Sequence, residues 1–177
     1  TNALKYAFDE KEEGVVKIYS YTSLIDILTE ADQSPNHSNH VWLAYTEESR
    51  PKYLLQYGSS GTGFWNREHI FPRSRGGFKS IKDDEKHVVW DSSPDSLRHA
   101  NSDAHGIRAT DAIENNLRGN SHYGEYNGPV GTQGSFRGDV ARAAFYLAIR
   151  YNGLDVVDGY PLQTGVLGDL QTLLEWH

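Results

Sequence analysis

The stretch from Trp65 to Pro72 constrains the fold more than any other part of the sequence. Its apolar residues suit a β-strand that the proline ends, and Glu68 and His69 stand side by side near that end. Neighbouring side chains of a strand point to opposite faces. The two groups can therefore face one ligand only where the backbone bends, with the carboxylate holding a cation and the imidazole acting on a water. The alternative is a surface glutamate beside a half-buried histidine.

The composition predicts one folded domain over residues 1–177. A chain of 177 residues, 37% of them hydrophobic, is long enough for a sizeable core. No apolar run approaches the roughly 20 residues of a membrane span, so we expect no membrane partner, and no obligate protein partner is indicated. The formal net charge of −7 disfavours binding of nucleic acid by charge alone, but it allows an enzyme with a local basic cleft.

The chain contains neither Cys nor Met, and it begins with Thr1. Without Cys there can be no disulfide and no thiolate zinc site. A first residue other than Met indicates a processed product or an excised fragment, which fits removal of a signal peptide. Cys and Met are also the most readily oxidised side chains. From these features we expect a secreted, extracellular protein.

Hydrophobic patterns predict helices and strands around the Glu68–His69 pair. Helices are predicted at 24–31, after Thr110 or Asp111 as a cap and ending near Gly119, at 140–151 with Asp139 as the cap, and at 167–176. Strands are expected at 15–21, 41–45 and 53–57, and polar loops at 32–40 and 120–133.

The short helix after Asp111 carries the second informative group of polar residues. At 3.6 residues per turn, Asp111, Asn115 and Arg118 share one face. Ile113 and Leu117 share the opposite face, which we expect to anchor the helix to the core. The polar face would then offer an amide oxygen and an arginine toward the acid–imidazole pair. The alternative is an ordinary solvated helix face.

A locally basic segment, residues 73–86, directly follows the acid–imidazole pair. It includes Arg73, Arg75 and Lys79 and is interrupted by the acidic residues 83–85. Such a segment is either a solvated loop or a loop that contacts phosphate. Its position beside the pair makes these three basic residues candidates for substrate binding.

Three motifs occur in order along the chain: Asn66-Arg67-Glu68-His69, Asp103-Ala-His105-Gly-Ile-Arg108-Ala-Thr-Asp111 and Asn115-Asn-Leu-Arg118-Gly-Asn120. Together they resemble the bacterial endonuclease I family, closest to its secreted, non-specific nuclease branch. The similarity extends over most of the chain.

The resemblance implies an α+β protein with a ββα-metal (His-Me finger) core, a small sheet surrounded by helices. It implies that Glu68 and Asn115 bind one Mg²⁺, with Mn²⁺ or Ca²⁺ as alternatives, and that His69 is the general base. The family motif has a different residue after the helical asparagine, which leaves Asn116 as an alternative ligand. The remaining candidates implied are three arginines for the phosphate or catalysis and one asparagine for the substrate: Arg73, Arg108, Arg118 and Asn120.

These residue types suit the hydrolysis of phosphodiesters. A neutral imidazole can take a proton from water, and a hard cation held by a carboxylate and an amide can stabilise developing negative charge. We therefore expect a metal-dependent, largely sequence-non-specific endonuclease that acts on DNA and on RNA. The alternative is a non-catalytic nucleic-acid- or metal-binding module on the same fold. The metalloprotease pattern His-Glu-x-x-His is absent.

Overall fold

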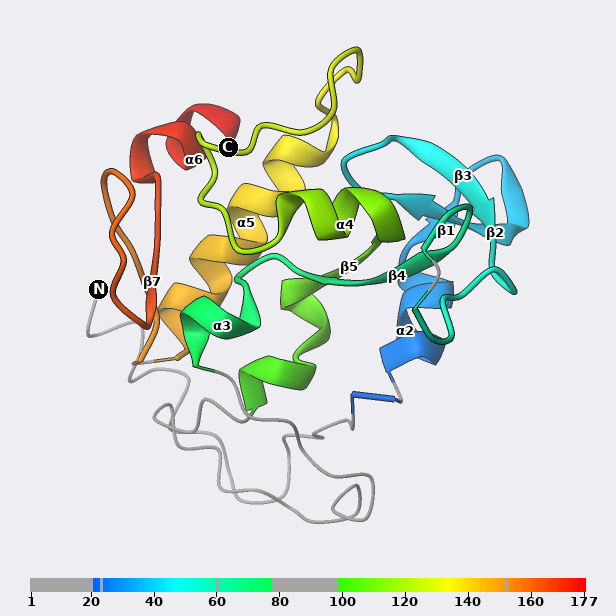
Figure 1. Ribbon diagram of the computed structural model, residues 1–177, viewed down its shortest axis with the longest axis horizontal. Helices are drawn as coiled ribbons and strands as arrows, with labels where there is room; N and C mark the ends of the chain where they lie inside the picture. The colour runs from blue at the N-terminus through cyan, green and yellow to red at the C-terminus, as the bar shows by residue number, and fades with distance from the viewer. Residues whose placement is uncertain (1–20, 23, 60, 78–98, 152) are drawn as a thin grey trace.

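The computed structural model describes residues 21–22, 24–59, 61–77, 99–151 and 153–177. Of the predicted strand at 15–21, only Tyr21 lies within these residues. Lys79 lies outside them. Helices and small sheets alternate along the described part (Figure 1), which confirms the expected α+β class. In chain order the elements are α2 (Leu24–Ala31), β1 (Gln33–Ser34), β2 (His37–Leu43), β3 (Glu48–Pro51), β4 (Trp65–His69), α3 (Arg73–Gly76), η2 (His99–Ser102), η3 (Ala104–Gly106), β5 (Ile107–Asp111), α4 (Ala112–Arg118), α5 (Phe136–Arg150), β6 (Asp155–Val156), β7 (Val166–Leu167) and α6 (Leu170–Trp176).

Two antiparallel sheets position the polar residues of interest. One has the strand order β1-β2-β3, and the other pairs β4 with β5 so that Glu68 lies opposite Arg108 and His69 opposite Ile107. A parallel bridge from Ala44 to Thr110 joins the two sheets. Helix α4 follows β5 directly and packs back on β4 and β5. The strand with the acid and the imidazole is thus covered by the helix with the polar face.

The core surrounds α5, which crosses the middle of the molecule in Figure 1. Val140, Ala144 and Leu147 are buried on this helix. Gly106 lies so close that a Cβ atom there would be 2.7 Å from a methyl group of Leu147. A glycine is therefore needed where η3 leads into β5, and α5 holds the start of that strand. None of the described helices has the length and apolar character that a membrane span requires.

The predicted helices are present, with differences at two starts. Helix α2 has the predicted bounds, and Leu24 and Leu28 are buried. Helix α5 begins four residues earlier than predicted, at Phe136. Helix α6 begins only at Leu170, because Leu167, the first residue of the predicted helix, pairs with β6 as the end of strand β7.

Two predictions about strands and loops were wrong. The expected loop at 32–40 contains β1 and the start of β2, and the expected strand at 53–57 is a loop in which Tyr53 and Tyr57 are 80% and 81% exposed. Strand β2 pairs with β1 and with β3, and Trp42 lies opposite Ser49 of β3. These strands are largely polar and exposed, so they lack the hydrophobic alternation that identifies a strand in a sequence.

The predicted anchoring of α4 was also wrong. Ile113 and Leu117 are 43% and 70% exposed, whereas Ala112 and Arg118 on the same helix are 0% and 1% exposed. The polar face is thus the inner face. An arginine can occupy it because buried acceptors, a carboxylate and two carbonyls, contact its Nη1 and Nη2 groups.

Candidate active site

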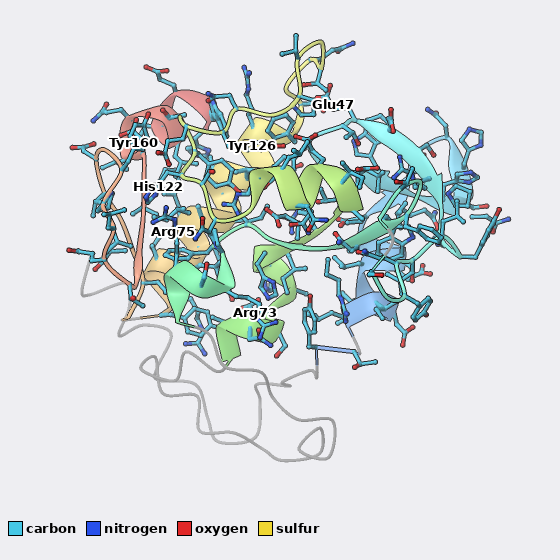
Figure 2. The ribbon with its side chains drawn as sticks, viewed as in Figure 1. Glu47, Arg73, Arg75, His122, Tyr126 and Tyr160 are labelled. Atoms are coloured by element: carbon cyan, nitrogen blue, oxygen red, sulfur yellow. The ribbon has the colours of Figure 1, made fainter. Side chains whose placement is uncertain are left out.

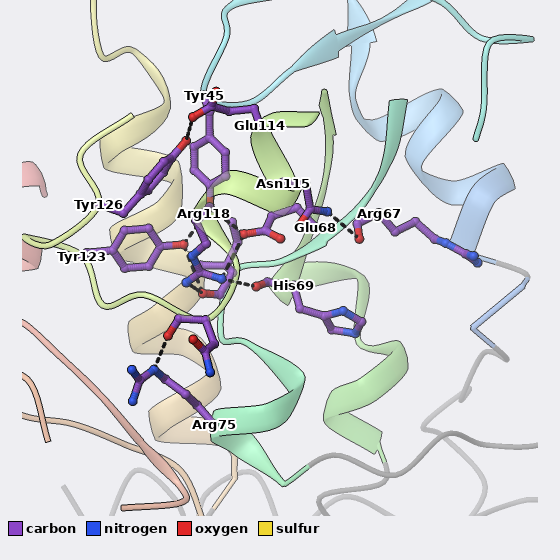
Figure 3. Close-up of polar contacts among 12 residues, drawn as sticks. Tyr45, Arg67, Glu68, His69, Arg75, Glu114, Asn115, Arg118, Tyr123 and Tyr126 are labelled. Atoms are coloured by element: carbon purple, nitrogen blue, oxygen red, sulfur yellow. Dashed lines mark hydrogen bonds and ion pairs between the residues drawn. The ribbon is translucent and has the colours of Figure 1, made fainter. Parts of the chain in front are cut away.

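An open pocket of about 750 Å³ lies where β4 ends. Strand β4 stops at His69 and the chain turns toward Pro72, so the adjacent acid and imidazole both reach this pocket. Helix α4 supplies the amide, as Figure 3 shows. The predicted residues that line the pocket are Glu68, His69, Arg73, Asn115, Arg118 and Asn120.

The Glu68 carboxylate is held through one of its two oxygens. Oε1 accepts a hydrogen bond from the Tyr45 hydroxyl at 2.8 Å and lies 3.0 Å from Nη1 of Arg118. Within the described part of the chain, Oε2 has no hydrogen-bond partner. Burial raises the pKa of the Glu68 carboxyl, while the Arg118 guanidinium and the Tyr45 hydroxyl act against this rise. Glu68 therefore presents one available oxygen at the floor of the pocket.

Arg118 is a buried support of the site. It donates hydrogen bonds to the carbonyls of His69 at 3.1 Å and Ile70 at 2.9 Å, in addition to its ion pair with Glu68. The Tyr123 hydroxyl also donates to the Ile70 carbonyl, at 3.1 Å. One guanidinium thus fixes both the acid and the backbone that carries the imidazole. Its side chain is 0% exposed, which favours this holding role over the predicted contact with phosphate.

The imidazole of His69 has a defined orientation. Its Nε2 lies 2.8 Å from the carbonyl oxygen of Asn101. A carbonyl can only accept, so Nε2 carries the proton and Nδ1 is the nitrogen that can take one. The Tyr21 ring stacks on the imidazole with a centroid distance of 5.4 Å and an interplanar angle of 20°. These two contacts hold the ring in place.

Burial, together with the positive charges of Arg73, Arg67 and Arg118, lowers the pKa of His69 to about 4. The hydrogen bond to the Asn101 carbonyl acts in the opposite direction. The imidazole is therefore neutral near pH 7. This is the protonation state that a general base requires.

The side-chain amide of Asn115 also has a defined orientation. Its Nδ2 donates to Oδ1 of Asn66 at 2.7 Å and to the Arg67 carbonyl at 3.4 Å. Its Oδ1 has no partner among the residues that the structure describes. Asn116, the alternative that the sequence left open, is exposed and is not part of the pocket lining. The geometry therefore favours Asn115 as the amide that faces a ligand.

Glu68 and Asn115 fit a hard divalent cation by the chemistry of their donor atoms. Each directs one oxygen at the same pocket that has no partner among the described residues, and Figure 3 shows the two side chains next to each other. Mg²⁺ prefers oxygen ligands, keeps several waters and binds through one or two protein groups. The described ranges contain no group of three or more His, Cys, Asp or Glu residues that could hold a metal.

Arg73 and Arg75 differ in their surroundings, although both belong to α3. Arg73 is exposed at the rim of the pocket. Arg75 donates to the carbonyls of Asn120 and Pro161, and Figure 2 shows it on the side of α3 that faces His122 and Tyr160. The placement favours Arg73 as a contact for substrate. A substrate-binding role for Arg75 stays a prediction that its carbonyl contacts do not favour.

Arg108 does not line this pocket. Its Nη1 donates to the Ile107 carbonyl at 2.7 Å, and its side chain lines a separate cavity of about 230 Å³ together with Asp32 and Asp139. The predicted catalytic role of Arg108 is therefore not favoured. The substrate-binding role of Lys79 stays a prediction, because this residue lies outside the described ranges.

Three residues of the site were not found from the sequence. Arg67 and Tyr21 both line the pocket, and the Arg67 guanidinium carbon lies 3.7 Å from the centre of the Tyr21 ring. Tyr45 donates a hydrogen bond to Glu68 and is not part of the pocket lining. Arg67 stands inside the motif and shares the strand face of His69, which was an available signal. Tyr21 and Tyr45 gave no signal, because only the folding of distant segments brings them to β4.

The comparisons with known proteins agree with the chemistry of this pocket. The sequence model of endonuclease I matches residues 2–135, which is most of the chain. The name of this family model is that of a class of nucleases, the hydrolases of phosphodiester bonds. The chain belongs to the endonuclease I family.

Two relatives share one name. An extracellular ribonuclease of Bacillus amyloliquefaciens is 32% identical over 198 aligned residues, and the alignment covers 99% of this chain and 61% of the relative. An extracellular ribonuclease of Bacillus subtilis (strain 168) is 34% identical over 181 residues, covering 89% of this chain and 55% of the relative. The chain therefore spans a little over half the length of these relatives. No solved structure matches it.

Proposed function

We propose that this chain is a metal-dependent, largely sequence-non-specific endonuclease that hydrolyses phosphodiester bonds of DNA and RNA. The strand–strand–helix unit of β4, β5 and α4 would be its ββα-metal core. One observation carries the proposal: an available carboxylate oxygen of Glu68, an available amide oxygen of Asn115 and the neutral imidazole of His69 share one pocket. Membership of a nuclease family supports it.

In this mechanism His69 is the general base. Its Nδ1 takes a proton from a water that attacks the phosphorus, while the Nε2 hydrogen bond to Asn101 keeps the ring in the required tautomer. Glu68 and Asn115 would hold the cation. A bound Mg²⁺, or Mn²⁺ or Ca²⁺ in its place, would supply stabilisation of the negative charge that develops in the reaction. Arg73 at the pocket rim binds phosphate through its N–H groups.

Three observations support the choice of substrate and location. The pocket offers arginines for phosphate, which carries no sequence information. The two relatives are named ribonucleases, which supports RNA as one substrate, and DNA is retained because phosphate contacts do not distinguish the two. Both relatives are named extracellular, which supports secretion. We propose no obligate protein partner.

The proposal is tested by cleavage of supercoiled plasmid and of RNA in a series of divalent metals, with EDTA as the control. We expect cleavage with Mg²⁺ or Mn²⁺ and none with EDTA. His69→Ala should lose most of the activity, at least about 100-fold, because proton transfer contributes that much to catalysis. His37→Ala removes an exposed histidine of β2 and should cleave like the wild type.

The alternative, a non-catalytic binding module, predicts a different result. Nucleic acid would be retarded in a gel but not cut in any metal of the series. Wild-type cleavage rates in a folded His69→Ala protein would refute the assignment of the base. Cleavage that persists in EDTA would refute the role of the cation.

A further inference from the structure

A chain of three side-chain amides leads from a surface loop to the pocket. Oε1 of Gln56 accepts a hydrogen bond from Nδ2 of Asn66 at 2.8 Å, and Oδ1 of Asn66 accepts one from Nδ2 of Asn115 at 2.7 Å. Backbone hydrogen bonds also join the loop with Gln56 to β4. The backbone N–H of Gln56 donates to the Trp65 carbonyl at 2.8 Å, and the backbone N–H of Trp65 donates to the Leu54 carbonyl at 2.9 Å. The three amides thus have a fixed frame.

The order of donors and acceptors in this chain matters for a cation. An asparagine side chain presents an acceptor oxygen on one side and a donor NH₂ group on the other, and the two are nearly the same in shape. Only the oxygen can bind a metal ion. A half turn of the Asn115 amide would direct its NH₂ group into the pocket and would remove one of the two protein ligands.

The neighbours of Asn115 allow one of these two orientations. Asn66 turns its Oδ1 toward Asn115, because its own NH₂ group donates to Gln56 on the other side. The second neighbour, the Arg67 carbonyl, can only accept. Both therefore require Nδ2 of Asn115 on the side of β4, which leaves Oδ1 on the side of the pocket.

We propose that Gln56 and Asn66 are positioning residues that set the side-chain amide of Asn115 with its oxygen toward the cation. The inference rests on the proposed function, because it assumes that Asn115 is a metal ligand. It adds a role for the first residue of the Asn66-Arg67-Glu68-His69 motif and for a loop residue outside every motif. Groups that orient a metal ligand typically change metal affinity by 10–100-fold when they are removed.

The test measures metal binding by calorimetry with Mn²⁺ alone, in the absence of nucleic acid. Asn66→Leu keeps the size of the side chain but removes its acceptor, and we expect the Kd for Mn²⁺ to rise at least about 10-fold. Asn66→Asp keeps an acceptor for Nδ2 of Asn115, and we expect a Kd no weaker than that of the wild type. Asn116→Leu replaces an exposed amide on the same helix and should bind like the wild type.

A folded Asn66→Leu protein with the Kd of the wild type would overturn the inference. Should that variant not fold, Gln56→Leu and Gln56→Glu test the same chain from the loop, since only the glutamate keeps the acceptor for Asn66. A higher Kd for Mn²⁺ in Gln56→Leu but not in Gln56→Glu supports the inference. Equal Kd values in these two variants overturn it. Glu68→Gln and Asn115→Leu identify the other failure: if neither weakens Mn²⁺ binding, the proposed metal site itself is wrong.

Discussion

At the residue scale, the site depends on polar atoms that are held from the side opposite the pocket. Tyr45 is fully buried. Its hydroxyl donates to Oε1 of Glu68 and lies 2.9 Å from the Tyr123 hydroxyl. Burial, with the nearby Glu68 charge, raises the pKa of Tyr45 well above its ordinary value, so it stays a donor. Because Arg118 contacts the same oxygen, the carboxylate has little freedom to rotate.

Tyr45→Phe removes one donor from a buried carboxylate. A hydrogen bond to a charged group contributes about 1.5–3 kcal/mol, so we expect a loss of that size in the free energy of unfolding, measured with urea in the absence of metal. The Kd for Mn²⁺ should also rise. Tyr126→Phe is the matched control, because the Tyr126 hydroxyl donates to Glu114 at 2.6 Å outside the pocket lining. If both variants change the Kd equally, Tyr45 does not act through Glu68.

At the element scale, α4 is a helix of only seven residues that must present Asn115 accurately. A helix this short is unstable in isolation. Its start is secured by Asp111, whose side chain accepts from the amides of Ile113 and Glu114 and pairs with Arg50 of β3. The cap thus connects the position of the helix to both sheets.

Asp111→Ala should lower the free energy of unfolding by about 1–2 kcal/mol, the usual effect of losing a helix cap. It should also weaken Mn²⁺ binding, because α4 frays at the end nearest β5. Asp169→Ala removes the equivalent cap of α6, which accepts from the Thr172 amide at 3.1 Å. This control should lose similar stability in urea unfolding but keep the wild-type Kd. Unchanged metal binding in Asp111→Ala would contradict the role of the cap.

At the scale of the whole molecule, Asp32 ties α2 to the second sheet and makes stability depend on pH. Its Oδ2 accepts from the Ala109 amide of β5 at 2.7 Å. Burial raises its pKa from 3.8 to about 6, against the opposing effects of this hydrogen bond and of Arg108, and Asp139 adds to the rise. A pKa that is higher in the folded state gives stability below about pH 4, which is lost as the pH rises through 6.

Asp32→Asn keeps an acceptor for the Ala109 amide and removes the buried charge. Above pH 7 we expect the variant to be more stable than the wild type, by up to about 3 kcal/mol from the size of the shift. Near pH 4 the difference should become small. Urea unfolding of both proteins across this range measures it. A difference that does not change with pH would mean that Asp32 titrates normally.

Much of the site could be predicted from the sequence, because short-range sequence patterns determine its strand and its helix. A strand that ends before Pro72, a cap at Thr110 or Asp111 and a helix that ends near Gly119 follow from short-range patterns, and the structure has the strand at 65–69 and the cap at Asp111. Asp111, Asn115 and Arg118 share a face simply by helical geometry. The resemblance to the endonuclease I family depended on the same local motifs, and the family match confirmed it.

The tertiary structure alone decided which atoms face the pocket. Tyr21 and Tyr45 reach β4 from distant segments, and Gln56 reaches it from the preceding loop. Arg118 is a buried support because a carboxylate and two carbonyls contact its guanidinium. The inner face of α4 is polar for the same reason, against the hydrophobic pattern. A sequence pattern records the chemistry of each side chain, but long-range contacts determine which of its polar atoms are already satisfied and which remain for a ligand.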